Sequence, residues 1–100
     1  MATEIKEVNG IIKVVGNLNS TNTKDLQNHL EKILWFGKGL ILNIDKVKQI
    51  DASGAYMLES LYKKARMENV RMSILGLDNN SIVQIMTQTK TKYILSNDRP

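Results

Sequence analysis

One long amphipathic helix between two short apolar segments is the feature that most limits the possible folds of this chain. The segment Ser53–Glu68 predicts a helix whose apolar residues recur at spacings of three and four. The apolar runs Leu40–Ile44 and Val70–Leu75 flank it and are typical of strands, and the first run suits a strand covered on both faces. A strand, a helix and a strand with this spacing form a crossover unit, so the two strands should be parallel.

The N-terminal segment predicts an antiparallel hairpin. Two runs that contain apolar residues, Glu4–Val8 and Ile11–Val15, flank the dipeptide Asn9-Gly10. Asn-Gly favours a tight hairpin turn, because both of its central residues need positive φ. Residues 16–21 are then expected to form a polar loop.

Two further helices complete the expected fold. A helix over residues 22–34 can be capped by Asn22 and Asp25, buries one apolar face and ends at the glycines of residues 37–39. A last helix can be capped by Asp78 or Asn79, and Ile94-Leu95 adds a short strand or packs against the sheet. The sequence therefore predicts a single α/β domain over residues 1–100, with a mixed sheet of about four to five strands covered by helices in the order ββαβαβα.

Composition excludes several classes of function. The chain has 100 residues, enough for one compact domain, and it has no cysteine, which excludes disulfides and thiolate metal sites. We find no apolar run of membrane-spanning length and no signal-peptide pattern at the N-terminus, so we expect a cytoplasmic protein without membrane insertion. The net charge is +4, but the lysines are scattered and lack interleaved aromatic residues. Direct nucleic-acid binding is therefore not expected.

The segment Val47–Ala55 is the candidate functional motif. Asp51 can cap the helix that follows it, which puts Ser53 in the first helical turn, and Gly54 would leave the approach to Ser53 open. A helix N-terminus tolerates an anion, so a phosphate on Ser53 should spare the fold, although Asp51 would repel it. Its charge and bulk would act mainly on a docked partner.

Over nearly its whole length the chain resembles the STAS domain family, in particular bacterial anti-sigma factor antagonists. The matching landmarks are Val14–Asn19, Asn22–Leu26, Leu40–Ile44 and Ile50–Gly54. The family motif is typically Asp-Ser-Ser-Gly, and its third residue, the phosphate acceptor, falls on Ser53. The resemblance implies binding to an anti-sigma factor that is also a serine kinase, release when the kinase phosphorylates Ser53, and resetting by a serine phosphatase.

The sequence departs from that pattern at several positions. Asn19 stands where many antagonists carry an aspartate, Ala52 replaces the commoner first serine, and Tyr56 is larger than the usual residue. Helical spacing from Ser53 predicts the partner-binding stripe, and the resemblance places the 17–21 loop near the same edge. The expected partner-binding residues are Asn19, Asp51, Ala52, Gly54, Tyr56, Met57, Ser60 and Lys64.

Two other functions are alternatives to the phosphorylation switch. A STAS domain that serves as a scaffold or a regulatory subunit, in a signalling assembly or beside a membrane transporter, would need no phosphorylation. An enzyme would need convergent polar groups, and neither the single histidine, His29, nor the pair Asp45 and Asp51 is accompanied by a nucleophile or by metal-ligand spacing. We therefore expect a binding protein without catalytic residues, metal or cofactor.

Overall fold

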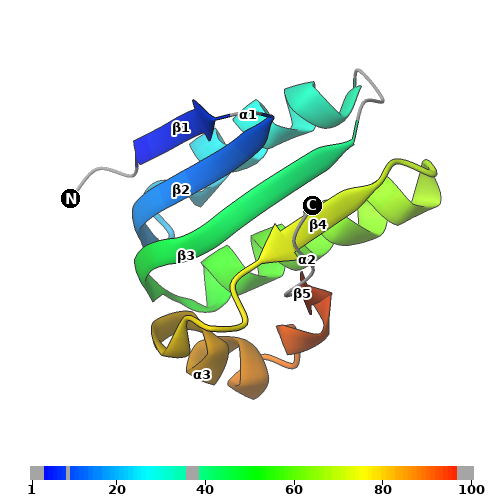
Figure 1. Cartoon of the computed structure of the whole chain (residues 1–100). Coiled ribbons are helices and arrows are strands. Elements are labelled where there is room, and N and C mark those ends of the chain that lie inside the picture. The colour runs from blue at the N-terminus through cyan, green and yellow to red at the C-terminus, as the bar shows by residue number, and fades with distance from the viewer. Residues whose placement is uncertain (1–3, 9, 36–38, 97–100) are drawn as a thin grey trace.

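The computed structural model describes residues 4–8, 10–35 and 39–96 of the chain, and in this part it contains one five-stranded sheet and three α-helices. The elements are β1 (Glu4–Val8), β2 (Ile11–Leu18), α1 (Thr23–Trp35), β3 (Leu40–Ile50), α2 (Ala52–Met67), β4 (Met72–Leu75), α3 (Asn80–Gln88), the short 3₁₀ turn η1 (Lys92–Ile94) and β5 (Leu95–Ser96). Figure 1 shows this arrangement, which confirms the predicted fold class and element order.

The strands lie in the order β1-β2-β3-β4-β5. β1 is antiparallel to β2, with Val8 opposite Ile11, and Gly10 has a φ of 81°, as a tight hairpin requires. Asn9, the other half of the predicted turn, lies outside the described residues, as do residues 37 and 38 of the predicted helix stop. The remaining neighbours pair in parallel, so the predicted parallel crossover between β3 and β4 is confirmed.

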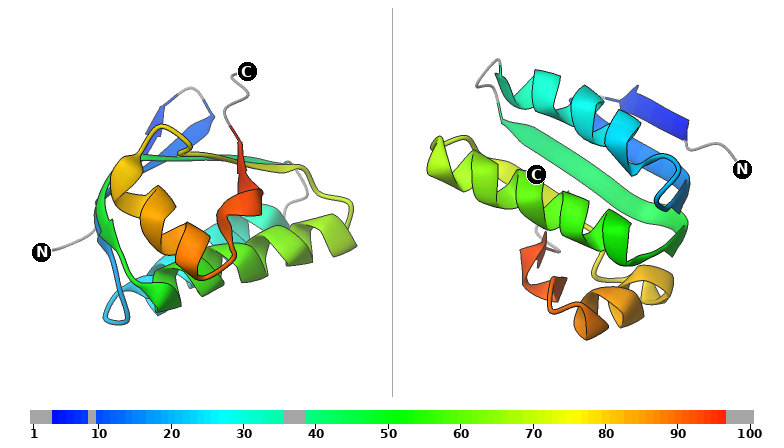
Figure 2. Two further views of the ribbon diagram at one scale, coloured as in Figure 1. Left: turned by 90° about the horizontal axis from the view of Figure 1, so that it is seen from below. Right: turned by 180° about the vertical axis from the view of Figure 1, so that it is seen from behind.

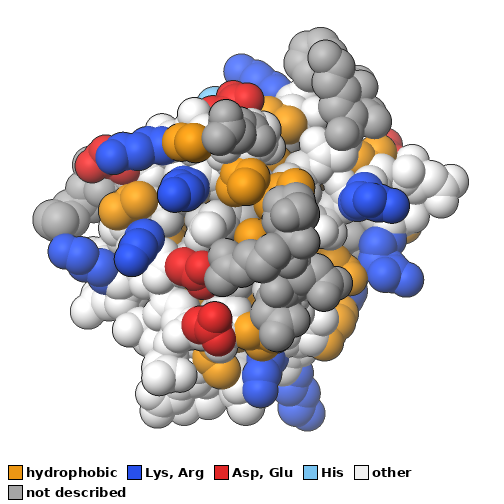
Figure 3. Space-filling view, viewed as in Figure 1, with side chains coloured by type: hydrophobic (Ala, Val, Ile, Leu, Met, Phe, Trp, Pro, Cys, Tyr) orange, Lys and Arg blue, Asp and Glu red, His pale blue; other side chains and the backbone are white. Residues whose placement is uncertain are grey.

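Helices α1 and α2 lie side by side on one face of the sheet, as the view from behind in Figure 2 shows. β3 therefore alternates: Leu40, Leu42 and Ile44 are buried toward the helices, whereas Ile41 and Asn43 are only half-buried on the opposite face. The prediction of a strand covered on both faces was wrong, because the short run hid a two-residue period. On the open face, basic side chains surround hydrophobic ones (Figure 3).

The core fills the space between the sheet and the helices. The apolar face predicted for α2 is buried, with Ala55, Leu58 and Leu61 at 0% exposure. Removing these surfaces from water supplies the main driving force for folding. α1 contributes the predicted residues Leu26, Leu30 and Leu34 to the same core, with Ile33 packed partly against it.

Strands β2 and β3 extend further than predicted. β2 continues through Gly16 and Asn17 to Leu18, and β3 continues to Ile50. The register between them shifts twice, between Lys13 and Val15 and between Gly16 and Asn17, and Gly16 has a φ of 108°. In the sequence, the residues at these register shifts resemble a loop. In the structure, the pairing of β2 with β3 continues past them as far as the start of α2.

Helix α2 ends in a Schellman motif. Asn69 adopts a φ of 58°, which confirms it as the residue that stops the helix. The N–H of Val70 donates to the carbonyl of Ala65 at 2.8 Å, and the N–H of Asn69 donates to that of Arg66 at 3.2 Å. The chain then turns directly back into β4.

Helix α3 is fixed to β3 by Asn79, one of the two predicted caps. The Asn79 side-chain oxygen accepts from the N–H of Ser81 at 3.0 Å. Its amide nitrogen lies 3.0, 3.1 and 2.8 Å from the carbonyl oxygens of Ile44, Asp45 and Val47 in β3. A single side chain therefore joins the start of α3 to the part of β3 where its register with β2 shifts.

Candidate functional site

The candidate site lies where β3 passes into α2. Asp51 is the N-cap residue of α2, with extended backbone angles, and Ser53 is the second helical residue. Ser53 and Ala52 are both exposed. The helix begins one residue earlier than predicted, but the predicted placement of Ser53 in its first turn is confirmed.

Asp51 connects three segments through its two carboxylate oxygens. Oδ1 accepts from the Ser53 hydroxyl at 2.6 Å and from the N–H of Gly54 at 3.0 Å. Oδ2 accepts from the N–H of Ser20 at 3.2 Å, 31 residues away in sequence. The Asp51 carboxylate therefore orients the Ser53 hydroxyl and ties the loop after β2 to the helix start.

These contacts shift the acidity of Asp51. Partial burial raises the pKa of the Asp51 carboxyl group. The Ser53 hydroxyl and the N–H groups of Gly54, Ser20 and Ser53 all stabilise the carboxylate, and together they outweigh burial and hold its pKa below the ordinary value. Asp51 is therefore charged at neutral pH, beside the exposed hydroxyl of Ser53.

This lowered pKa predicts a pH dependence of stability. An unfolded aspartate titrates near pH ~3.9. Because the folded pKa is lower, the stabilisation from Asp51 is present above that value and is lost as the pH falls through the folded pKa. In urea unfolding between pH 6 and pH ~2.5, we expect Asp51→Asn to lose less stability on acidification than the wild type, and Ser53→Ala to lie between them. Parallel pH profiles for the wild type and Asp51→Asn would contradict this assignment.

The loop between β2 and α1 lies against the start of α2, as predicted for residues 17–21. Leu18 pairs with Ile50, and its carbonyl accepts from the N–H of Asp51 at 3.0 Å. Asn19 folds the loop by accepting from the N–H and the hydroxyl of Thr21. Asn19 and Ser53 are thus brought to the same edge. Sequence reasoning missed the contact of Ser20, because nothing local in the sequence links it to Asp51.

Two of the expected partner-binding residues point inward. Met57 is only 6% exposed and belongs to the hydrophobic core, so it is not available to contact a partner. Gly54 is buried, and a Cβ there would lie 2.9 Å from Ile50 Cγ1 and 3.0 Å from the Leu18 carbonyl oxygen. Glycine therefore allows α2 to approach β2 and β3 closely; the explanation that it opens the approach to Ser53 was wrong.

The exposed stripe instead follows Ser53, Tyr56, Ser60 and Lys64. Tyr56 is 52% exposed, and Ser60 is exposed one turn further along. Lys64 is half-buried, with its amine 3.7 Å from a carboxylate oxygen of Glu31 in α1. We call Asn19, Ser20, Asp51, Ser53, Tyr56 and Ser60 the switch surface.

The described residues contain neither a metal centre nor a helix that could span a membrane. Within them, no three His, Cys, Asp or Glu side chains gather closely enough to hold a metal ion. No helix in the described ranges is both long and apolar enough to cross a membrane.

Residues 1–95 match the STAS domain family, and the chain belongs to that family. Among curated protein sequences, none matches the chain significantly.

Solved structures with the same fold include two anti-sigma factor antagonists. The antagonist from Mycobacterium paratuberculosis is 13% identical with a TM-score of 0.75, over 94% of this chain and 81% of its own. The antagonist SpoIIAA in its unphosphorylated form is 13% identical with a TM-score of 0.74, over 98% of this chain and 89% of its own. At this identity the likeness establishes a shared fold.

Proposed function

We propose that this STAS domain is an anti-sigma factor antagonist that binds an anti-sigma factor with serine kinase activity through the switch surface. The kinase phosphorylates Ser53 and thereby ends the binding. The observation that carries the proposal is an exposed serine hydroxyl in the first turn of α2, held by Asp51 beside the 19–22 loop. The likeness of the fold to two antagonists supports the same function.

The geometry suits a switch that acts on the partner while the domain stays folded. A phosphate at Ser53 would lie in solvent at a helix N-terminus, where anions are stabilised by about 0.3–1 kcal/mol. The Asp51 carboxylate, 2.6 Å from the unmodified hydroxyl, would repel the phosphate and offset that gain. The added charge of about −1.5 to −2 therefore has little net effect on folding, whereas a docked partner would have to desolvate it.

The proposed cycle also needs a reset. A serine phosphatase would remove the phosphate from the same exposed position and restore binding. Because the kinase consumes ATP, we place the protein in the cytoplasm. The domain itself is a substrate in this cycle and supplies no catalytic group.

The test is phosphorylation by the anti-sigma factor kinase encoded in the same genome. Incubation with this kinase and Mg-ATP is expected to add one phosphate, which mass spectrometry of proteolytic fragments locates on Ser53. Ser53→Ala should stay unmodified, whereas Ser60→Ala, which removes an exposed serine of the same helix, should be modified as the wild type is. Phosphate on Ser60, or none on either serine, would reject the proposal.

A constitutive scaffold is the second candidate, and exposed Tyr56 favours it, because tyrosine often anchors permanent interfaces. A scaffold would bind its partner equally well with serine or aspartate at position 53. Loss of binding through Tyr56→Ala alone, with Ser53→Asp neutral, would select this function.

A further inference from the structure

A hollowed surface lies near the C-terminal end of α2, away from the switch surface. Two adjoining hollows of about 410 Å³ each share Tyr62 and Arg66. One continues over Asn69, Val70, Arg71 and Met72 toward β4, and the other continues over Lys63 and Tyr93 toward η1. We call the two together the α2–β4 cleft.

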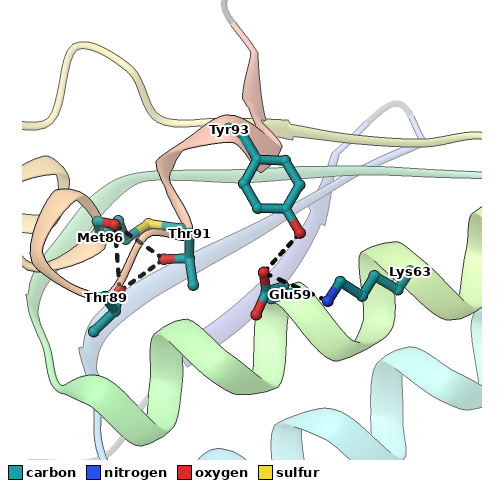
Figure 4. A network of polar contacts seen from close by, with 6 residues as sticks. All are labelled: Glu59, Lys63, Met86, Thr89, Thr91 and Tyr93. Atoms are coloured by element: carbon teal, nitrogen blue, oxygen red, sulfur yellow. Dashed lines mark hydrogen bonds and ion pairs between the residues drawn. The ribbon is translucent and has the colours of Figure 1, made fainter.

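Aromatic side chains give the cleft a defined shape. The rings of Tyr62 and Tyr93 meet edge to face, with centroids 6.3 Å apart and planes at 86°. Tyr93 is nevertheless 58% exposed, and its hydroxyl donates to a carboxylate oxygen of Glu59 at 2.6 Å, as Figure 4 shows. Glu59 also lies 3.8 Å from the amine of Lys63. This network fixes the end of the cleft nearest η1.

The guanidinium groups of the cleft lack an acidic partner among the residues that the structure describes. Arg66 lies over the Tyr62 ring, 5.7 Å from its centroid, and donates to the Tyr62 hydroxyl at 3.4 Å. Neither Arg66 nor Arg71 forms an ion pair within the described ranges. In Figure 3, basic side chains lie at the right-hand edge of the molecule, near the start of β4. Two such guanidiniums beside exposed tyrosine favour binding of carboxylates.

The shape of the cleft favours an extended ligand over a small anion. Arg66 lies where the two hollows join, Arg71 lies in one of them, and half-buried Val70 and the exposed ring of Tyr93 line the surface beside them. A single small anion would bind one guanidinium group and leave this apolar surface exposed to water. An extended peptide that alternates acidic and apolar residues would cover both kinds of surface.

We propose that the α2–β4 cleft binds an acidic, extended segment of a partner protein, with carboxylates on Arg66 and Arg71 and apolar side chains against Val70 and the ring of Tyr93. Arg66 is thirteen positions after Ser53 on α2, which places the two residues about 20 Å apart along the helix. Binding in the cleft is therefore independent of the charge at Ser53. The domain would hold one partner while the switch surface exchanges another.

The test uses a synthetic peptide of alternating glutamate and leucine, titrated into ¹⁵N-labelled full-length protein. Amide shifts are expected at residues 62–72 and at Tyr93, and the double variant Arg66→Ala/Arg71→Ala should weaken binding at least tenfold. The double variant Arg66→Lys/Arg71→Lys should weaken binding less, because lysine keeps both positive charges and loses only the two-pronged guanidinium group. The matched control Lys24→Ala/Lys48→Ala, which removes two exposed cations elsewhere, and Ser53→Asp should both bind as the wild type does.

Three results would overturn the proposal. The first is equal binding of the matched glutamine–leucine peptide, which would remove the role of charge. The second is unchanged affinity in the double arginine variant. The third is binding of inorganic phosphate or ATP in the cleft without binding of the acidic peptide, which would make this a small-anion site.

Discussion

Phosphorylation of Ser53 is expected to weaken binding to the anti-sigma factor kinase at least a hundredfold, a loss of about 2.8 kcal/mol. The reason is that Ser53 lies at the centre of the switch surface, with Asp51 directly beside it and the 19–22 loop adjacent. A docked partner would enclose the phosphate next to the Asp51 carboxylate, where like charges repel. Isothermal titration calorimetry on the unmodified and the enzymatically phosphorylated protein measures this loss.

Two variants separate the position of the charge from its presence. Ser53→Asp is expected to reproduce part of the loss, whereas Ser60→Asp, two turns along the same exposed stripe and away from Asp51, should reduce affinity less than Ser53→Asp does. Thermal unfolding of the phosphorylated protein should stay close to that of the unmodified protein. If phosphorylation lowered the unfolding temperature strongly, or left affinity intact, the account of a switch that acts on the partner would fail.

Replacement of Asn79 by alanine is expected to lower the free energy of unfolding by about 2–3 kcal/mol, because it removes a helix cap and the side-chain hydrogen bonds to three carbonyl groups of β3. The Asn79 amide nitrogen lies within 3.1 Å of three carbonyl oxygens of β3, and its oxygen caps α3. No other residue type of this size offers both a donor and an acceptor there. Urea unfolding, followed by circular dichroism, measures the change.

Asn79→Asp shows which half of the side chain matters. Aspartate keeps the cap acceptor but lacks the donor and would face the β3 carbonyls with a negative charge, so it should destabilise the domain as well. Asn80→Ala is the matched control, because Asn80 is the exposed neighbour at the first position of α3. Wild-type stability in the aspartate variant would reduce the role of Asn79 to helix capping.

The fold was predictable wherever a pattern of neighbouring residues determines the local structure. The apolar spacing of α2, the stop at Asn69 and the cap at Asp51 each depend on a few neighbouring residues, and each is confirmed. The predictions failed where burial depends on the packing of distant segments. Leu40–Ile44 is apolar except at Asn43, and only the position of the helices shows that one of its faces is uncovered. Met57 satisfies the spacing of an exposed stripe although it is buried.

At the candidate site, local sequence was enough to predict that a serine hydroxyl begins a capped helix after a strand, because helix capping depends on adjacent residues. The surroundings of that hydroxyl depend instead on how distant segments pack. The pairing of β2 with β3 brings Leu18 beside Ile50, and this places Ser20 on Asp51 and Gly54 against two strands. Contacts between residues some thirty positions apart depend on the register of the strands. The two register shifts between β2 and β3 set that register, and no local pattern in the sequence predicts them.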